Sequence, residues 1–377
     1  MDFSLTQEHE VLRQSMKEFG EGVIAPKVRE MEETSEMPLD VVAEMAKLGM
    51  MGVTIPRDLG GTGLGHLARM IMIEEIARIS AAIGMSLQMF HTGAGAILAG
   101  GNDEQRNKYL PDLATGLRFA TLAVTEPGGG SDPFAIQTTA KLEGDLYTVS
   151  GRKCFIENSH LADIHTVTAR TGEGPRDIST LIVDKDTPGW RPGRLEHKMG
   201  LRGSQVGEVI LENCRVPKEN LLGAEGQGVR VALGGISAYG RPGTAACALG
   251  ILNGCLEAAT RFAKERILYG KPIAELQAIQ WNICDIYLDL ETSRLLVYRA
   301  AWMLDTAQRA DAEIAAAKFY TTEAAVRSAK KTMDIHGAYG CMNEYAAQRY
   351  YRDAQLLISA AGTSEIQRMI MVRKPLS

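Results

Sequence analysis

The segment TEPGGGSDP, Thr125–Pro133, marks the point at which the pattern of the whole chain changes. Its three consecutive glycines stand between two hydroxyl residues, which predicts a loop with exposed backbone N–H groups. Such a loop can cradle a phosphate or the edge of a flavin, and a simple tight turn has the same composition. The sequence on either side has to decide between these two interpretations.

Before this loop, residues 1–116 have the apolar spacing of helices and form a first, helical domain. In the stretch 35–50 we expect a helix that begins either at Ser35 or at an acidic first turn. It buries one apolar face, made of Leu39, Val42, Met45, Ala46 and Leu48.

The loop lies near the start of residues 117–225, which contain short β-branched runs separated by Gly, Pro and Asp, among them LYTVSGRKCFI and IHTVTAR. These runs predict a middle domain made of antiparallel strands. Residues 226–377 return to long helical periods with broad apolar faces, which are typical of a helix bundle or of an oligomer interface.

Composition excludes several classes of function. The 377 residues are 45% apolar and 23% charged, and the net charge of −5 argues against nucleic acid as a partner. The six cysteines form no CxxC pair, so we expect neither a metal site nor disulfides. The acidic start MDFSLTQEHE is unlike a signal peptide, and no apolar run reaches the roughly 18 residues of a membrane helix. We therefore expect a cytoplasmic protein without a membrane segment.

Six motifs together carry a resemblance. TEPGGGSD is followed by GRKCFIEN, KMGLRGSQVGEVILENCRVPKENLLGAEGQG, RFAKERILYGKPIAELQAIQ, DIHGAYGCMNEYAAQRYYRDAQ and AAGTSEIQR. In this order and spacing the set resembles the acyl-CoA dehydrogenase family over nearly the whole chain. The resemblance implies a helical N-terminal domain, a β-barrel-like middle domain and a C-terminal four-helix bundle, assembled as a homotetramer. It also implies FAD as cofactor, an acyl-CoA as substrate and an electron-transfer flavoprotein as electron acceptor.

The same resemblance assigns residues to the cofactor and to the substrate. The FAD contacts it implies are Val124, Thr125, Ser131, Glu157, Arg266, Gln277, Asp334, Gly337 and Thr363. Arg266 and Gln277 would reach the FAD of a neighbouring subunit, and the planar fork of an arginine suits a diphosphate. Without the resemblance, both would be read as solvated surface residues. Ser131, Arg241 and Gly362 would contact the substrate.

The sequence departs from the family at the catalytic glutamate. The family carries this residue either directly before the glycine of GTSEIQ, where Ala361 stands here, or before the arginine matched by Arg241, where Gly240 stands. A positioned base is typically worth about 10²–10⁴-fold in rate, so ordinary α,β-dehydrogenation should be slow.

Three residues are candidates for the proton chemistry instead. Glu157 replaces a family threonine near flavin N5, where a carboxyl can bond reduced N5 or relay a proton; it can equally pair with Lys153. His91, in SLQMFHTGAG, is either a relocated base or a core residue. Tyr239 is a weaker candidate because the pKa of a free tyrosine is about 10.

Three functions remain open at this point. The first is an oxidoreductase that passes a hydride from an unusual acyl-CoA, unsaturated or cyclic, such as a 1-ene-1-carboxyl-CoA with no α-proton. The second is a lyase in which loss of sulfinate or carboxylate supplies the electrons. The third is a non-catalytic subunit of a mixed oligomer.

Overall fold

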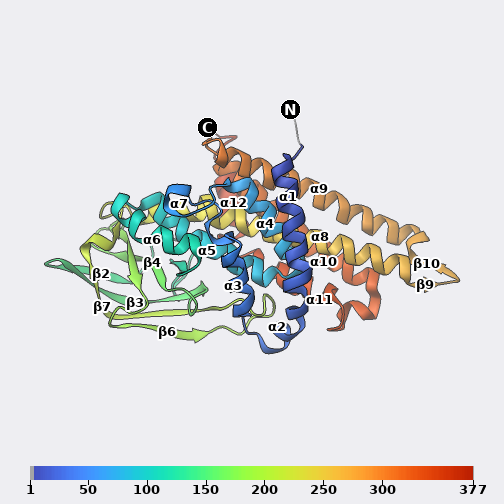
Figure 1. The fold of residues 1–377 in the computed structure, drawn as a ribbon, viewed down its shortest axis with the longest axis horizontal. Coiled ribbons are helices and arrows are strands. Elements are labelled where there is room, and N and C mark those ends of the chain that lie inside the picture. The colour runs from blue at the N-terminus through green and yellow to red at the C-terminus, as the bar shows by residue number, and fades with distance from the viewer. Residues whose placement is uncertain (1–3, 377) are drawn as a thin grey trace.

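The computed structural model describes residues 4–376, and the chain runs from helices through one sheet and back to helices (Figure 1). The N-terminal helices are α1 (Gln7–Phe19), α2 (Val28–Thr34), α3 (Leu39–Lys47), α4 (Gly65–Ile79), α5 (Ala81–Gly100) and α6 (Asp103–Thr115). Their ends follow local rules. The hydroxyl of Ser80 accepts from the backbone of Ile83 at the start of α5, and Asn102 and Gln105 form a capping box on α6.

The helix expected over residues 35–50 is present, and it begins at Leu39 with the acidic residue Asp40 in its first turn. Ser35 does not begin it; Ser35 lies in the left-handed region, with φ of 62°, and ends α2. The expected buried face is wrong in part. The buried face contains Val42 and Met45, whereas Leu39 and Leu48 are 60% and 56% exposed. Pro38 is the N-cap of α3, and a residue before a proline disfavours the helical conformation, so the helix begins only after Pro38.

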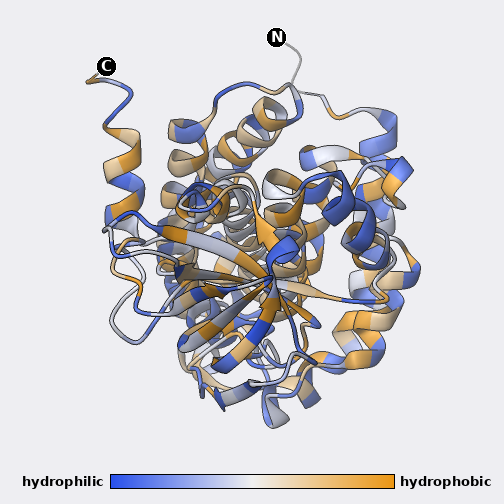
Figure 2. Cartoon of the chain, turned by 90° about the vertical axis from the view of Figure 1, so that its left-hand side faces the viewer, coloured by the Kyte–Doolittle hydropathy of each residue, from blue (hydrophilic) through white to orange (hydrophobic). Residues whose placement is uncertain are grey.

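The middle of the chain forms one sheet with strand order β6-β7-β3-β2-β4-β5-β8. The strands are β1 (Ala120–Ala123), β2 (Thr139–Glu143), β3 (Leu146–Glu157), β4 (Ile164–Arg170), β5 (Ile178–Asp184), β6 (Trp190–Leu195), β7 (Val206–Pro217) and β8 (Leu221–Leu222). Most pairs are antiparallel as expected, but β1 and β2 both pair with β4 in the parallel direction. Figure 2 shows hydrophobic stretches both in these strands and in the helices.

The C-terminal part is a bundle of long helices. It comprises α7 (Gly228–Gly235), α8 (Arg241–Glu265), α9 (Gln277–Asp305), α10 (Asp311–His336), α11 (Ala346–Leu357) and α12 (Ser364–Met371), with the small hairpin β9 (Ile267–Leu268) and β10 (Lys271–Pro272). Helices α8, α9 and α10 pack on one another, and α4 packs on α8. The sheet and the β9–β10 hairpin therefore stand at opposite ends of the molecule (Figure 1).

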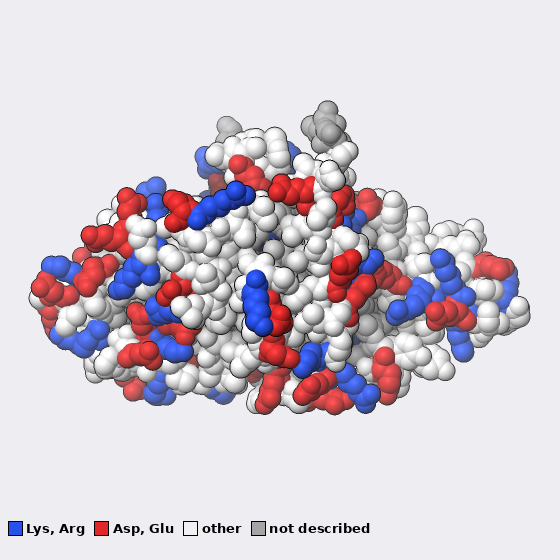
Figure 3. All heavy atoms as spheres, viewed as in Figure 1, with Lys and Arg blue, Asp and Glu red and all other residues white. Residues whose placement is uncertain are grey.

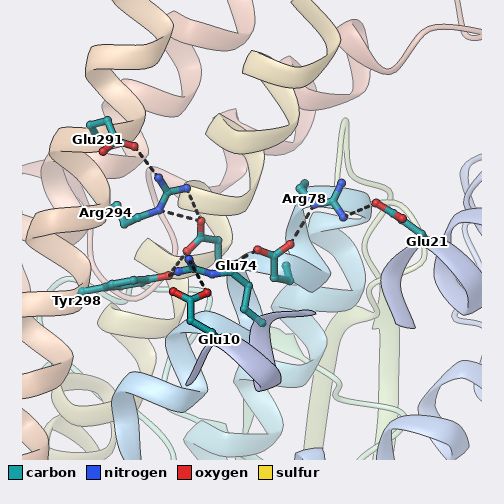
Figure 4. Close-up of polar contacts among 9 residues, drawn as sticks. Glu10, Glu21, Glu74, Arg78, Glu291, Arg294 and Tyr298 are labelled. Carbon is teal, nitrogen blue, oxygen red and sulfur yellow. Dashed lines mark hydrogen bonds and ion pairs between the residues drawn. The ribbon is translucent and has the colours of Figure 1, made fainter. Parts of the chain in front are cut away.

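A buried ion network fastens the N-terminal helices to this bundle (Figure 4). The buried carboxylate of Glu74 accepts from Arg294 at 2.8 Å and from the hydroxyl of Tyr298 at 2.5 Å, and Arg13 donates to the same hydroxyl at 2.7 Å. In the same network Arg78 donates to the carboxylate of Glu21 at 3.0 Å. Helices α1, α4 and α9 are thus held together by charge as well as by packing.

On the face shown in Figure 3, basic and acidic side chains are interspersed, without a broad area of one sign. Within residues 4–376, no helix combines the length and the apolar character needed to cross a membrane.

Candidate active site

The glycine-rich loop is anchored by a buried ion pair that lies directly behind it. The carboxylate of Glu126 accepts from the backbone N–H groups of Gln137 at 2.6 Å and Thr138 at 3.0 Å, and from Nζ of Lys153 at 2.7 Å. Burial lowers the pKa of Lys153 to about 8, while Glu126 opposes that lowering. The sequence analysis did not identify Glu126 as the partner of Lys153, although the motifs TEPGGGSD and GRKCFIEN contain these two residues.

Lys153 also fixes the backbone that the flavin is expected to contact. Its Nζ donates to the carbonyl oxygen of Val124 at 3.1 Å, and the neighbouring N–H of Cys154 donates to the carbonyl oxygen of Thr125 at 2.9 Å. Lys153 is therefore engaged by Glu126 and Val124 rather than by Glu157. Further along the loop, Ser131 is exposed.

Glu157 ends strand β3 and is buried where the sheet meets α5 and α8. The hydroxyl of Ser204 donates to its carboxylate. Ser86 of α5 lies close enough to lower the pKa of Glu157, and the charge of Glu157 raises the pKa of Cys247 of α8. Burial raises the pKa of Glu157 to about 7, against the opposing effects of Ser204 and Lys198. This carboxyl can therefore change its protonation state near neutral pH.

The turn before α12 brings the two expected glutamate positions together. Ala361 and Gly362 both have positive φ, 53° and 100°, and the hydroxyl of Thr363 caps α12. A Cβ placed on Gly240 would lie 3.6 Å from the Cβ of Ala361, and its next neighbours are side-chain carbons of Ile236. Two positions far apart in the sequence thus lie side by side, and the three atoms nearest to a Cβ on Gly240 are all carbons.

Lys318 of α10 holds this turn in place, and sequence reasoning did not identify it. Its buried Nζ donates to the carbonyl oxygens of Ile358 at 2.5 Å and Gly362 at 2.9 Å. Arg241, the first residue of α8, is also buried, and its Nη1 donates to the hydroxyl of Ser237 at 3.1 Å. Both cations therefore border the Gly240 and Ala361 positions.

Tyr239 precedes Gly240 in a π-helical turn and is buried. The guanidinium of Arg69 lies 4.8 Å from the centre of its ring and donates to the carbonyl oxygens of Ala238 and Tyr239, both at 3.2 Å. Burial raises the pKa of Tyr239 above its ordinary value. A phenol with a raised pKa is a poor proton acceptor.

His91 lies in the middle of α5 and is buried. Its Nε2 lies 2.8 Å from the carbonyl oxygen of Met50 and so carries the proton, while Nδ1 is without a hydrogen-bond partner among residues 4–376. Burial and the charge of Arg69 lower the pKa of His91 to about 3. The ring is neutral, with a lone pair available at Nδ1, but that nitrogen is weakly basic.

Four other predicted FAD residues gather at the far end of the bundle, beside the β9–β10 hairpin. Arg266, Gln277, Asp334 and Gly337 are all exposed there, and the Arg266 guanidinium lies 5.6 Å from the ring centre of Tyr339. Gly337 has φ of 59° and a Cβ there would meet open space, so a ligand can approach this backbone closely. One chain therefore places its predicted flavin contacts in two separate regions. One lies where the sheet meets the helices, and the other lies beside the β9–β10 hairpin (Figure 1).

Buried polar atoms without a hydrogen-bond partner indicate whether the region between the end of β3 and α12 fits a flavin. Oδ1 of Asn158, which follows Glu157, and Oε1 of Gln367 are buried without a hydrogen-bond partner in the described part of the chain. The amide nitrogen of Gln367 donates to the carbonyl oxygens of Ala361 and Gly362, at 3.3 and 2.9 Å, so this side chain lies against the turn. Free acceptors at these places fit a ring that carries N–H donors.

Comparison with known proteins gives the same family for all three parts of the chain. Models of the acyl-CoA dehydrogenase N-terminal, middle and C-terminal domains match residues 6–117, 121–214 and 226–376. An acyl-CoA dehydrogenase of Bacillus subtilis is 40% identical over 371 residues, 97% of each protein. The caffeyl-CoA reductase-Etf complex subunit CarC of Acetobacterium woodii is 38% identical, again over 97% of each. The structure of butyryl-CoA dehydrogenase from Megasphaera elsdenii superposes over the full length of both chains with a TM-score of 0.98 at 33% identity.

Proposed function

Because the chain belongs to the acyl-CoA dehydrogenase family and is an FAD-dependent oxidoreductase of that type, we propose that it acts on an unsaturated or cyclic acyl-CoA whose oxidation requires no α-proton removal. The observation that carries this proposal is the hydrocarbon contact between the Gly240 and Ala361 positions. A thioester that is already unsaturated at the α-carbon, such as a 1-ene-1-carboxyl-CoA, has no α-proton. A carboxylate at that point would have nothing to accept.

FAD, when bound, supplies the acceptor for the hydride that leaves a carbon of the acyl group. Val124, Thr125 and Thr363 would hold the ring from the end of β1 and the start of α12. The proton that balances the hydride has to leave another carbon, beyond the α-position. A group of the chain must receive it there.

We infer that Glu157 is this group. Its pKa of about 7 matches the requirement that a general base be half ionised near the working pH. His91, with a pKa of about 3, and Tyr239, with a raised pKa, are less suited to the same task. The hydroxyl of Ser204 and the ammonium of Lys198 hold and tune the Glu157 carboxyl.

The predicted FAD contacts are divided between the region near the sheet and the region beside the β9–β10 hairpin, and this division supports a homotetramer. Arg266 and Gln277 flank the β9–β10 hairpin, which stands at the opposite end of the molecule from the sheet, and would complete the flavin site of a neighbouring subunit (Figure 1). Helix α9 presents a matching apolar stripe at intervals of seven residues: Trp281, Leu288, Leu295 and Trp302 are 52–62% exposed. A seven-residue apolar repeat is the pattern by which helices pair.

Two further parts of the proposal rest on relatives. The Acetobacterium relative is named as a subunit of a caffeyl-CoA reductase-Etf complex. We infer that an electron-transfer flavoprotein likewise takes the electrons from this enzyme, in the cytoplasm.

The test is anaerobic bleaching of the bound flavin by a panel of CoA thioesters. We expect rapid bleaching by at least one unsaturated or cyclic thioester and slow bleaching by butyryl- and hexanoyl-CoA. Rapid bleaching by the saturated thioesters alone would reject the proposed substrate class.

A further inference from the structure

Arg241 is a buried cation that no carboxylate neutralises. Its Nη1 donates to Ser237, its Nε has no hydrogen-bond partner in the chain from Ser4 to Leu376, and no acidic oxygen of those residues lies within 4.0 Å of it. The nearest acidic influence is Asp311, whose carboxylate is already bonded by Arg309 at 3.0 Å. A buried charge in this condition is costly, because burial removes its water and nothing replaces it.

Lys318 is a second cation in the same condition. Its Nζ donates only to carbonyl oxygens within the described residues, and the carboxylate of Glu323, which influences it, accepts from the hydroxyl of Ser364 at 2.6 Å. Burial lowers the pKa of Lys318 to about 8, and the positive charge of Arg241 adds to the lowering. The two cations therefore lie close enough to repel one another.

Among the described residues, two other buried cations have a carboxylate, whereas the buried Arg69 bonds only the carbonyl oxygens of Ala238 and Tyr239. Lys153 has Glu126 at 2.7 Å, and Arg78 has Glu75 at 3.1 Å. The difference at Arg241 and Lys318 coincides with the two positions where a glutamate was expected, since Arg241 follows Gly240 and Lys318 binds the carbonyl of Gly362, which follows Ala361. Both cations are present there, and no carboxylate of the described residues forms an ion pair with either of them.

We propose that the anion comes with the substrate: the enzyme selects an acyl-CoA whose acyl group carries its own carboxylate, held by Arg241 beside Gly240 and Ala361. This inference rests on the proposed function, since it assumes that a CoA thioester occupies this site. A planar guanidinium with a free Nε–H is the donor that suits a carboxylate. In a site shielded from water, such a charge-assisted contact discriminates strongly against a methyl group of the same size.

Succinyl-CoA and butyryl-CoA provide the test, because they have four acyl carbons each and differ in a terminal carboxylate against a methyl group. Binding to the FAD-loaded enzyme is followed anaerobically by the change in flavin absorbance. We expect succinyl-CoA to bind at least about tenfold more tightly, which corresponds to 1.4 kcal/mol. Arg241→Met should abolish this preference, and Arg29→Leu, which removes an exposed arginine on α2, should leave it intact.

Ala361→Glu is a second variant that does not remove a buried group. Its new carboxylate would neutralise the same cations, so the preference for succinyl-CoA should fall to near unity. Equal binding of the two thioesters to the wild-type enzyme would overturn the inference and leave the proposed function standing. If the FAD-loaded enzyme binds neither thioester, the inference is overturned, and bleaching by the unsaturated and cyclic thioesters decides the proposed function separately.

Discussion

The Cβ of Ala361 lies 3.6 Å from the point where a Cβ on Gly240 would stand. The two residues belong to the turn before α12 and to the start of α8, and Lys318 pins that turn by its bond to Gly362. A glutamate at either position would place its carboxylate in the same small region. The chain has neither, so no carboxylate stands there to take an α-proton or, among the described residues, to pair with Arg241.

Glu157 should give the folded protein a distinct pH dependence. Burial raises its pKa from 4.5 to about 7, so the folded protein keeps a proton that the unfolded chain releases. This contribution to stability is fully present below pH 4.5 and is lost as the pH rises through 7. At about 1.4 kcal/mol for each pKa unit, the change is roughly 3 kcal/mol. Glu157→Gln should remove it, so the difference in Tm between pH 5 and pH 8 should shrink.

Glu36→Gln is the control for this measurement, because Glu36 is exposed. It should leave the difference in Tm unchanged. If the Glu157→Gln and wild-type proteins lose stability equally between pH 5 and pH 8, the Glu157 carboxyl is not protonated in the folded protein.

His91→Ala separates a core role from a catalytic one. Because Nε2 bonds the Met50 carbonyl and the pKa is about 3, we expect the variant to lose about 1–3 kcal/mol of stability. Its kcat on the best substrate should fall less than about tenfold, since we assign proton acceptance to Glu157. A fall of about 10²–10⁴-fold with normal FAD content would show that His91 is the relocated base.

Arg266→Ala should weaken FAD retention without unfolding the chain. The guanidinium is exposed in the single chain and rests only on Tyr339, so its loss removes little internal packing. Loss of charge-assisted bonds to a diphosphate, worth roughly 1.5–3 kcal/mol, should lower FAD affinity about 10- to 100-fold. The ratio of FAD to protein after gel filtration measures this. Arg191→Ala, an exposed arginine of β6, should retain FAD as the wild type does.

The stripe on α9 should control assembly. Replacing Leu288 and Leu295, which are 61% and 55% exposed, by glutamate places charges at the centre of the stripe. We expect the tetramer to dissociate to smaller species in light scattering, with FAD lost at the same time. Leu142→Glu, at an exposed position of β2, is the matched control. A variant that remains tetrameric would exclude this stripe as the interface.

The sequence predicted the order of helices, sheet and helices because the apolar period changes at Thr125–Pro133, and local caps such as Asn102 and Gln105 set element ends. It did not predict the partner of Lys153, because only Glu157, four residues away, was considered and Glu126 is 27 residues away in the sequence. Only the register of β3 places Lys153 behind the glycine loop. Lys318 was missed for a similar reason. The sequence of a helix does not show that the ammonium of one of its lysines donates to a distant turn, here to the carbonyl oxygen of Gly362.

The apolar spacing also did not predict which individual leucines are buried. Leu39 is apolar at a helical spacing, yet it stands at the first residue of α3 and faces solvent. The chemistry of the site depends on contacts between residues more than a hundred positions apart, such as Gly240 with Ala361. Periodicity along the chain carries no information about such contacts.

The most direct test is the rate at which butyryl-CoA bleaches the flavin of the wild-type enzyme and of Ala361→Glu under anaerobic conditions. If α-proton removal is missing because the Gly240 and Ala361 positions hold no carboxylate, the wild-type rate will be low and the glutamate will raise it by about 10²–10⁴-fold. Wild-type bleaching at a rate on the order of 1–10³ s⁻¹, unchanged by the substitution, would contradict the account.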